Sequence, residues 1–268
     1  MPGILSSIFD SKRILRKIKG SFNNCLQKIP FRVVFILILT GAYGCNSSGP
    51  TVEHRSPIIE PDRYNVAFLI MDGVYNTELT APYDIFQHTI FREGIKPMNT
   101  FLVADTHQPV TSFEGIRLLP DFNYVEDDLP HIDILVVPSA EHHLDSDLEN
   151  EVMINWVKEV GEKAMYVTSH CDGAFVLAKA GLLDNVASTT FPSDIDLYRE
   201  RFPELDVRDS VLFVHDGKFI TSAGGAKSFE AALYLVEELY GKDIAISIAS
   251  GLVIDWANFS FPYIRIDR

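Results

Sequence analysis

Cysteine is scarce in this chain of 268 residues, which has only Cys25, Cys45 and Cys171. Three cysteines do not suggest a disulfide framework. Basic residues are also scarce once the first 44 residues are set aside. That segment holds seven of the 23 Lys and Arg and one of the 37 Asp and Glu, which leaves 16 basic and 36 acidic residues and a formal net charge of −20 for the rest. Phosphate groups would repel so acidic a body, so we do not expect binding to nucleic acid.

The chain also lacks a long hydrophobic run near its basic start. The apolar stretch from residue 31 spans about a dozen residues, whereas a membrane-spanning helix needs about 20. Its length is typical of the hydrophobic region of a signal peptide. Gly41, Ala42 and Gly44 lead directly to Cys45, which resembles a bacterial lipoprotein signal with Cys45 as the lipidated first residue, although Ala42 stands where Leu is commonest. An uncleaved signal anchor and a different cleavage site are the alternatives.

These features predict four segments along the chain. Residues 1–44 are expected to be a signal peptide of the lipoprotein type, and residues 45–62, which contain several prolines and polar residues, a flexible tether. Residues 63–258 are expected to form one domain, followed by a C-terminal tail at residues 259–268. The predicted location is the bacterial cell envelope, with the domain outside the cytoplasm and a membrane attachment through the lipid on Cys45.

Within the domain, short apolar runs alternate with segments of helical periodicity, and we see no internal repeat. The expected strands are at residues 64–71, 101–104, 132–138, 165–168 and 219–225, and the clearest helices are at residues 152–160 and 228–240. Continuous apolar runs are typical of parallel strands buried on both faces. The alternation therefore predicts an α/β fold, a mostly parallel sheet with helices on both sides.

The most informative stretch surrounds Cys171, where an apolar run stops and a helix-prone run begins at once. A nucleophile at such a strand-to-helix corner needs small neighbours, which Ser169 and Gly173 supply. The amino end of the helix would favour the thiolate form of the cysteine. The alternative is an inert cysteine buried after a central strand, because cysteine is among the most buried residue types.

Sites in parallel sheets form at the carboxyl ends of the strands. Three such ends carry candidate side chains: the loop and first helical turn with Glu78, the loop at residues 139–143, and Cys171. Thr77 is expected to cap the helix that carries Glu78. Glu78 could take part in acid–base chemistry, or it could be a solvated acid that complements the helix dipole.

Several of these segments resemble a known family. Residues 171–184 and 187–190 closely resemble the ThiJ/PfpI superfamily. Residues 78–86 match the acid-Leu-x-Gly-Pro-x-x-x-Phe pattern of the branch that includes isonitrile hydratases and the amidase-like sensor domains of AraC-type regulators. Residues 221–224 match the late Ser-x-Gly segment of that branch. The resemblance covers roughly residues 64–256.

The resemblance implies a three-layer α/β/α sandwich of the flavodoxin-like, class I glutamine-amidotransferase-like kind. It implies an active-site cysteine at Cys171, an acid at Glu78 that touches the sulfur, and backbone N–H donors at Asp172 and Ala140 that stabilise an oxyanion. A homodimer and a small-molecule substrate are expected, with no cofactor and no metal. The leading hypothesis is a cysteine-dependent hydrolase or hydratase acting on a small electrophilic carbon. The alternative is a ligand-binding or thiol redox-sensing lipoprotein.

The chain departs from the branch at several positions. Glu78 replaces an Asp, and Asp172 replaces a Thr beside the cysteine, where its carboxylate could oppose thiolate formation. Ser139 and Ala140 replace a Gly-Gly pair in the oxyanion loop. The residues after Thr190 are Phe-Pro where the AraC-type sensors usually have His-Trp, and we do not expect the helix-turn-helix segment of those regulators in this sequence.

The histidines give weaker signals. His170 is expected to point away from Cys171, since neighbours in a strand face opposite sides, and no late His-x-Glu of the glutaminase type is present. Residues 141–143 with Asp145 could bind a metal, although adjacent loop histidines are more often simply exposed. His215 is expected to be a strand-end residue.

Overall fold

The computed structural model describes residues 57–258 and 260–267. Cys25, Cys45, the predicted signal peptide and most of the predicted tether lie outside these residues. No helix in the described ranges combines the length and the apolar character that crossing a bilayer requires.

An eight-stranded sheet runs through the centre of the domain, with the strand order β12-β10-β11-β7-β6-β1-β2-β5. All neighbouring strands in it are parallel except β10 and β11. The strands are β1 (Tyr64–Leu69), β2 (Met98–Ala104), β5 (Phe122–Asn123), β6 (Ile134–Val137), β7 (Tyr166–His170), β10 (Phe213–Asp216), β11 (Phe219–Ser222) and β12 (Tyr263–Ile266). Two small two-stranded sheets pair β3 (Val110–Thr111) with β4 (Arg117–Leu118) and β8 (Ala187–Ser188) with β9 (Asp206–Val207).

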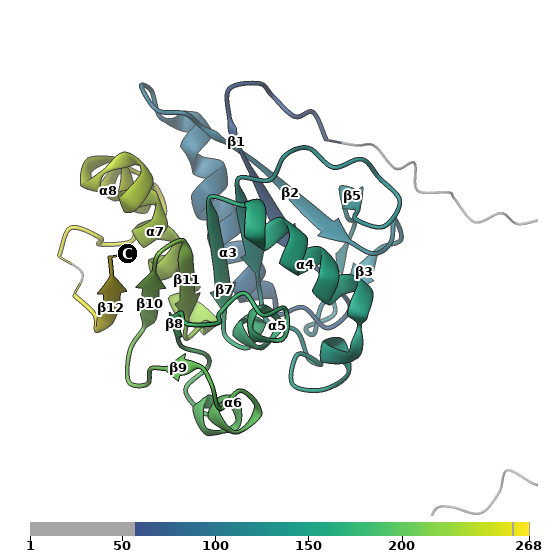
Figure 1. Ribbon diagram of the computed structural model, residues 1–268. Coiled ribbons are helices and arrows are strands. Elements are labelled where there is room, and N and C mark those ends of the chain that lie inside the picture. The colour runs from purple at the N-terminus through teal and green to yellow at the C-terminus, as the bar shows by residue number, and fades with distance from the viewer. Residues whose placement is uncertain (1–56, 259, 268) are drawn as a thin grey trace, which may run out of the picture. The chain divides into compact units, whose positions relative to one another are not determined.

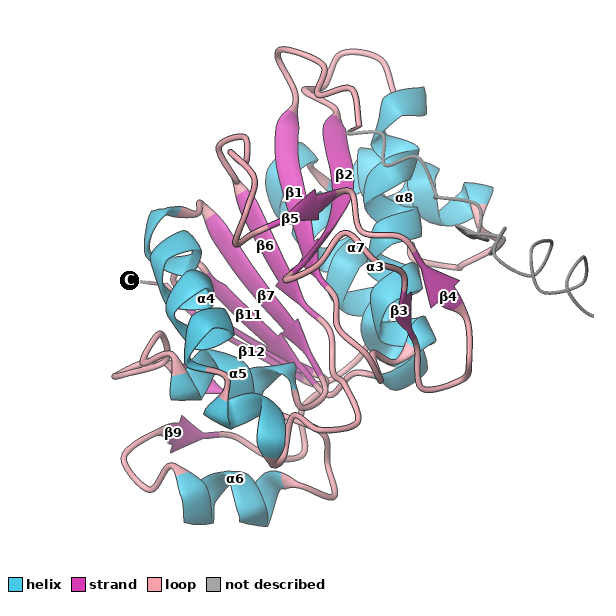
Figure 2. Ribbon diagram, turned by 90° about the vertical axis from the view of Figure 1, so that its right-hand side faces the viewer, coloured by secondary structure: helices cyan, strands magenta, loops and turns pink. Residues whose placement is uncertain are grey.

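Helices cover both faces of the sheet, as Figures 1 and 2 show. One face carries α3 (Asn76–Gln87), α7 (Ser228–Tyr240) and α8 (Lys242–Gly251), and the other carries α4 (Glu151–Lys163) and α5 (Gly173–Lys179). The short helix α6 (Ile195–Arg201) lies beside β9. Short 3-10 turns complete the chain: η2 (His88–Phe91), η3 (Ser146–Glu149) and η4 (Gly225–Lys227). The predicted three-layer α/β/α sandwich is confirmed.

Alternation along β1 shows why the sheet must be covered on both sides. Val66 and Phe68 belong to the core under α3 and α7, whereas Ala67 and Leu69 belong to the core under α4 and α5, and all four are buried. Because a strand points successive side chains to opposite faces, an uninterrupted apolar run requires a hydrophobic layer on each side. The run that predicted this strand therefore also accounts for the two helical layers.

The start of α3 differs from the prediction. Thr77 does not cap this helix, because the helix already begins at Asn76 and its N-cap position is Tyr75, whose side chain makes no capping hydrogen bond. The shift of two residues moves Glu78 from the first to the third helical position, and it stays in the first turn as expected.

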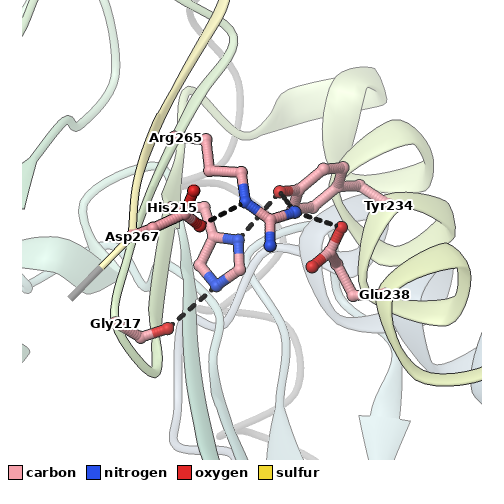
Figure 3. A network of polar contacts seen from close by, with 6 residues as sticks. All are labelled: His215, Gly217, Tyr234, Glu238, Arg265 and Asp267. Carbon is pink, nitrogen blue, oxygen red and sulfur yellow. Dashed lines mark hydrogen bonds and ion pairs between the residues drawn. The ribbon is translucent and has the colours of Figure 1, made fainter.

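Residues 259–268, which we expected to be a tail, contribute β12 to the sheet. β12 pairs with β10 in parallel, so that Tyr263 lies beside Phe213 and Arg265 beside His215. Figure 3 shows the polar network that joins this strand to α7. Arg265 donates to Glu238 at 2.6 Å and to Asp267 at 2.7 Å.

His215 lies at the centre of that network, in β10 as predicted. Its Nε2 lies 2.9 Å from the Gly217 carbonyl oxygen, which can only accept, so Nε2 carries the proton. Its Nδ1 then accepts from the Tyr234 hydroxyl at 2.8 Å. Burial lowers the pKa of His215, which keeps the imidazole neutral in this arrangement.

We expect Tyr234→Phe to lower the free energy of unfolding by about 1–3 kcal/mol, because it leaves the buried Nδ1 of His215 without a donor. Urea denaturation of the two proteins at pH 7.5 measures the change. Tyr263→Phe is the matched control, since Tyr263 is 46% exposed and should tolerate the loss of its hydroxyl. Equal stability of Tyr234→Phe and the unaltered protein would contradict the network.

Candidate active site

Cys171 lies at the corner between β7 and α5, as predicted, in a backbone conformation that few cysteines adopt. Its φ is +53°, in the left-handed region that side chains other than glycine seldom occupy. Its N–H donates to the Ser222 carbonyl at 2.9 Å, which fixes the end of β7 against the end of β11. The side chain is 7% exposed. Such local strain persists only where the surroundings enforce it, and it is common at active sites.

Two glycines make room for this corner. A Cβ on Gly173 would lie 2.1 Å from the Val137 carbonyl oxygen, and a Cβ on Gly224, whose φ is +74°, would lie 2.4 Å from the Cβ of Cys171. Gly173 was predicted to serve as a small neighbour of the cysteine. Gly224 was not, because 53 residues separate it from Cys171 and only the fold brings them together.

Glu78 is buried beside the cysteine rather than solvated. It is 5% exposed. Its Oε2 accepts from the Ser139 N–H at 3.1 Å, and its Oε1 accepts from the Gly225 N–H at 3.0 Å. Burial raises the pKa of this carboxyl, and the two N–H groups partly oppose that effect. The alternative of a solvated first-turn acid is therefore wrong, while a role for Glu78 in catalysis stays a prediction.

Asp172 brings a second carboxyl group to the sulfur. The Cys171 Sγ lies 3.6 Å from Asp172 Oδ2, and Asp172 Oδ1 accepts from the Thr190 hydroxyl at 2.9 Å. Burial raises the pKa of Asp172 to about 6, although the bond from Thr190 lowers it. The sequence had pointed to the backbone N–H of Asp172 as a donor and to its carboxylate as a group that opposes thiolate formation, and the second expectation agrees with the raised pKa of the Cys171 thiol.

These surroundings hold the cysteine in its thiol form. Burial raises the pKa of the Cys171 thiol well above its usual range, and the carboxyl groups of Glu78 and Asp172 raise it further. The Asp172 N–H and the Ser139 hydroxyl act in the opposite direction but do not prevail. The Asp172 N–H at the amino end of the helix favours the thiolate, as expected, but burial and the two carboxyl groups outweigh it in the resting protein. A nucleophilic Cys171 must lose its proton during the reaction.

The predicted oxyanion donors lie at the right edge of the sheet. Ala140 forms an isolated bridge with Val74, through bonds from Tyr75 N to Ser139 O and from Glu141 N to Gly73 O. Neither bond uses the Ala140 N–H, whereas the Ser139 N–H is taken by Glu78. Replacement of Gly-Gly by Ser-Ala thus leaves a main-chain donor at Ala140, and its role stays a prediction.

The structure adds Tyr75 to the surroundings of the cysteine. Burial raises the pKa of its hydroxyl, and the charges of Cys171, Glu141, Glu78 and Asp172 raise it further. Its ring packs against Phe113, with 4.8 Å between the ring centroids. No motif pointed to Tyr75, because it was expected to lie in an ordinary turn.

The histidines do not pair with Cys171. The Nδ1 of His170 lies 3.1 Å from the Ser222 hydroxyl, which itself donates to the Ser169 carbonyl, so His170 is the donor. Burial lowers the pKa of His170 to about 3. In the loop considered for a metal, His143 is fully buried with its Nε2 3.1 Å from the Met71 sulfur, and His142 is exposed. Among the described residues no group of three or more His, Cys, Asp or Glu is placed to hold a metal ion.

A cavity of about 570 Å³ adjoins this site. Its volume is within the range of small-molecule sites. Thr190, which hydrogen-bonds the Cys171 carbonyl oxygen and Asp172, belongs to its wall. Ala223, Leu212, Ile195 and Arg199 line other parts, and the side chains of Cys171, Glu78 and Asp172 are not among its lining. Thr190 therefore connects the cavity to the carboxyl group beside the sulfur.

Comparison with known proteins agrees with this architecture. The model of the DJ-1/PfpI family matches residues 64–238. An isonitrile hydratase from Pseudomonas putida is 32% identical over 183 residues, which are 67% of this chain and 74% of the hydratase. The HTH-type transcriptional regulator CdhR from Pseudomonas aeruginosa is 32% identical over 102 residues, 38% of this chain and 30% of the regulator. The crystal structure of a THiJ/PfpI family protein from Pseudomonas syringae matches with a TM-score of 0.63 and 24% identity, over 76% of this chain and 84% of that one.

We expect Gly173→Ala to lower the free energy of unfolding by about 3 kcal/mol or more, because the new methyl group would collide with backbone atoms of the β6 end that cannot move aside. Thermal unfolding measures the effect. Gly251→Ala is the control: it adds the same methyl group at the end of α8, where the nearest atom is an Arg92 nitrogen 3.6 Å away. If both variants unfolded at the same temperature, the close approach at Gly173 would not matter.

Proposed function

The chain belongs to the DJ-1/PfpI family, and from that premise we propose that it is a cysteine-dependent enzyme that acts on a small molecule with an electrophilic carbon. The observation that carries the proposal is the grouping of the Cys171 thiol with two buried carboxyl groups, those of Glu78 and Asp172. One group can accept a proton while the other donates one, which is the requirement for addition of a nucleophile and a proton to the same substrate.

Hydration of an isonitrile is the reaction to test first, because an isonitrile hydratase is among the relatives. In this reaction the Cys171 sulfur forms a bond to the terminal carbon of the isonitrile, and the thiol proton reaches that carbon through a neighbouring carboxyl group. Water then adds to the carbon and gives a proton to the nitrogen. The carbon–sulfur bond breaks, the sulfur regains a proton, and the product is an N-substituted formamide.

The N–H groups of Asp172 and Ala140 would stabilise the negative charge that develops during the addition and breakdown steps. Glu78, held at both oxygens by backbone N–H groups, has the fixed orientation that proton transfer requires. Its raised pKa makes the protonated form available nearer to neutral pH. We therefore assign to Glu78 the delivery of a proton to the substrate.

Ligand binding without catalysis is the second candidate, and two observations favour it. The thiol is neutral at rest, which also makes it a poor target for oxidation, and the cavity of about 570 Å³ could hold a ligand without any reaction at the sulfur. In this case the ligand would lie in the cavity beside Thr190, and Cys171 would take no part in a reaction.

We expect the unaltered protein to convert an alkyl isonitrile to the matching formamide, with no turnover by Cys171→Ala and a loss of about 10²–10⁴-fold in kcat for Glu78→Gln. Gas chromatography of the formamide measures the rate. His142→Gln, a change at an exposed loop residue, should keep full activity. Absence of turnover together with saturable binding of the isonitrile, seen by calorimetry, would favour the ligand-binding candidate.

We further propose that the domain is attached to the bacterial cell envelope by a lipid on Cys45 and acts there as a homodimer. The basic segment, the short apolar stretch and the small residues before Cys45 support the attachment. The dimer rests on resemblance to the family alone.

If Cys45 carries the lipid, Cys45→Ser should move the protein from the membrane fraction to the soluble fraction of the producing bacterium, or leave it as an uncleaved precursor of higher mass. Fractionation followed by mass spectrometry distinguishes these products from the unaltered protein. Cys25→Ser is the control and should stay with the membrane in its processed form. A signal anchor would give a different result. Cys45→Ser would stay attached to the membrane, and both it and the unaltered protein would have the mass of the unprocessed chain.

A further inference from the structure

The site poses the question of which group takes the proton from Cys171. The thiol is neutral at rest because of burial and the two carboxyl groups. The imidazole of His170 is committed to Ser222, and burial keeps it neutral. The carboxyl groups of Glu78 and Asp172 are the ionisable side chains that act on the thiol, and they are the candidates for its proton acceptor.

The two carboxyl groups differ in how their oxygens are occupied. Each oxygen of Glu78 accepts a backbone N–H, from Ser139 and from Gly225, and the same carboxyl group also hydrogen-bonds the Cys171 side chain. In Asp172 only Oδ1 has another donor, the Thr190 hydroxyl at 2.9 Å, and Oδ2 faces the Cys171 sulfur at 3.6 Å. Both carboxyl groups thus reach the thiol, but the Glu78 oxygens share it with backbone N–H groups, whereas the thiol is the donor that the described residues supply to Asp172 Oδ2.

Thr190 determines that orientation. Its side chain is 1% exposed, and its Oγ1 lies 2.9 Å from Asp172 Oδ1 and 3.1 Å from the Cys171 carbonyl oxygen. A hydroxyl has one proton and can share it between two acceptors. Thr190 therefore links the Asp172 carboxylate to the backbone of Cys171, and the other carboxylate oxygen contacts the thiol of that same residue.

We propose that the Asp172 carboxylate is the base that accepts the proton of the Cys171 thiol, and that Thr190 is the residue that positions it. The proposal rests on the nucleophilic role of Cys171 in the proposed function. In the step itself the S–H bond breaks, the proton moves to Asp172 Oδ2, and the sulfur electron pair forms the bond to the attacked carbon. With iodoacetamide as the probe, the carbon–iodine bond breaks at the same time and iodide leaves.

Other charged groups face this pair and set the background. Glu78 on α3 and Asp194 before α6 both raise the pKa of Asp172 through space, and Thr190 lowers it. Glu78 raises that of Cys171 as well, and the Tyr75 hydroxyl lies within the field of the same groups. Asp172 could also act on Cys171 through its charge alone, by repelling the thiolate without accepting the proton.

The two roles of Asp172 predict opposite effects of Asp172→Asn. If Asp172 only repels, removal of its charge lowers the pKa of the thiol, and Cys171 becomes more reactive near neutral pH. If Asp172 is the base, the substitution removes the proton acceptor, and Cys171 becomes less reactive. The side chain keeps its size, and its oxygen can still accept from Thr190.

The test follows alkylation of Cys171 by iodoacetamide in the full-length protein, with the Cys171 peptide quantified by mass spectrometry from pH 5 to 9. We expect the rate of the unaltered protein to rise through a pH near 6, the pKa of Asp172, and then to level off. In Asp172→Asn that rise should be absent, and the rate at pH 7 should fall at least about tenfold. An equal or higher rate in Asp172→Asn at pH 7 would overturn the proposal.

Two further changes separate positioning from structure. Thr190→Val removes the bond to Oδ1, so the rise should move to higher pH and the rate should fall, while Thr190→Ser should restore both. Asp194→Asn removes a neighbouring charge that does not contact the sulfur, so the rise should move slightly to lower pH and keep its height. An unchanged profile in Thr190→Val would show that Thr190 does not position the base.

The alkylation rate does not depend on any natural substrate. Failure of isonitrile hydration with the expected alkylation profile would count against the proposed reaction and leave Asp172 as the base. If the unaltered protein hydrates isonitriles but Asp172→Asn has an unchanged alkylation profile, the proposed reaction stands and Asp172 is not the base.

Discussion

The structure of the site depends on a single backbone constraint, the left-handed turn at Cys171. Conformations of this kind cost of order 1–3 kcal/mol and persist only where neighbouring contacts enforce them. Here the hydrogen bond from the Cys171 N–H to the Ser222 carbonyl fixes the backbone of the turn. The close packing of neighbouring atoms at Gly173 and Gly224 leaves little room for the turn to relax. The turn brings the sulfur to the carboxyl edge of the sheet, where Glu78 from α3 and the 139–140 loop also end.

The second property of the site is its surplus of acidic groups. A helix amino end offers a partial charge of about half a unit, and α5 has only seven residues. Burial of the sulfur, together with the two buried carboxyl groups, outweighs it, and so the thiol keeps its proton. A neutral thiol between two carboxyl groups suits chemistry in which proton transfer accompanies attack. A neutral thiol is a poor target for oxidation, which suits the location outside the cytoplasm that we propose.

The departures from the branch that includes isonitrile hydratases are concentrated beside the sulfur. Replacement of the oxyanion loop glycines keeps the Ala140 N–H, and the Ser139 N–H holds Glu78. Replacement of Thr by Asp at position 172 changes the chemistry more, because it puts an ionisable group in contact with the thiol. The match over residues 64–238 shows the family, and Asp172 is the departure that lies beside the sulfur.

Local pattern in the sequence was sufficient to predict the layers of the fold, the corner at Cys171 and the loops that meet there. A continuous apolar run identifies a strand whose two faces are both buried. The change from a strand pattern to a helix pattern beside small residues predicts the sharp turn at Cys171. The start of α3, the pairing of β12 and the ionisation of the site were not predictable in this way. Gly224, Thr190 and Tyr75 act on Cys171 across long stretches of chain. Burial of Glu78 and Asp172 sets the state of the thiol, and burial is a property of the packed structure, since it depends on which segments exclude water from the same space.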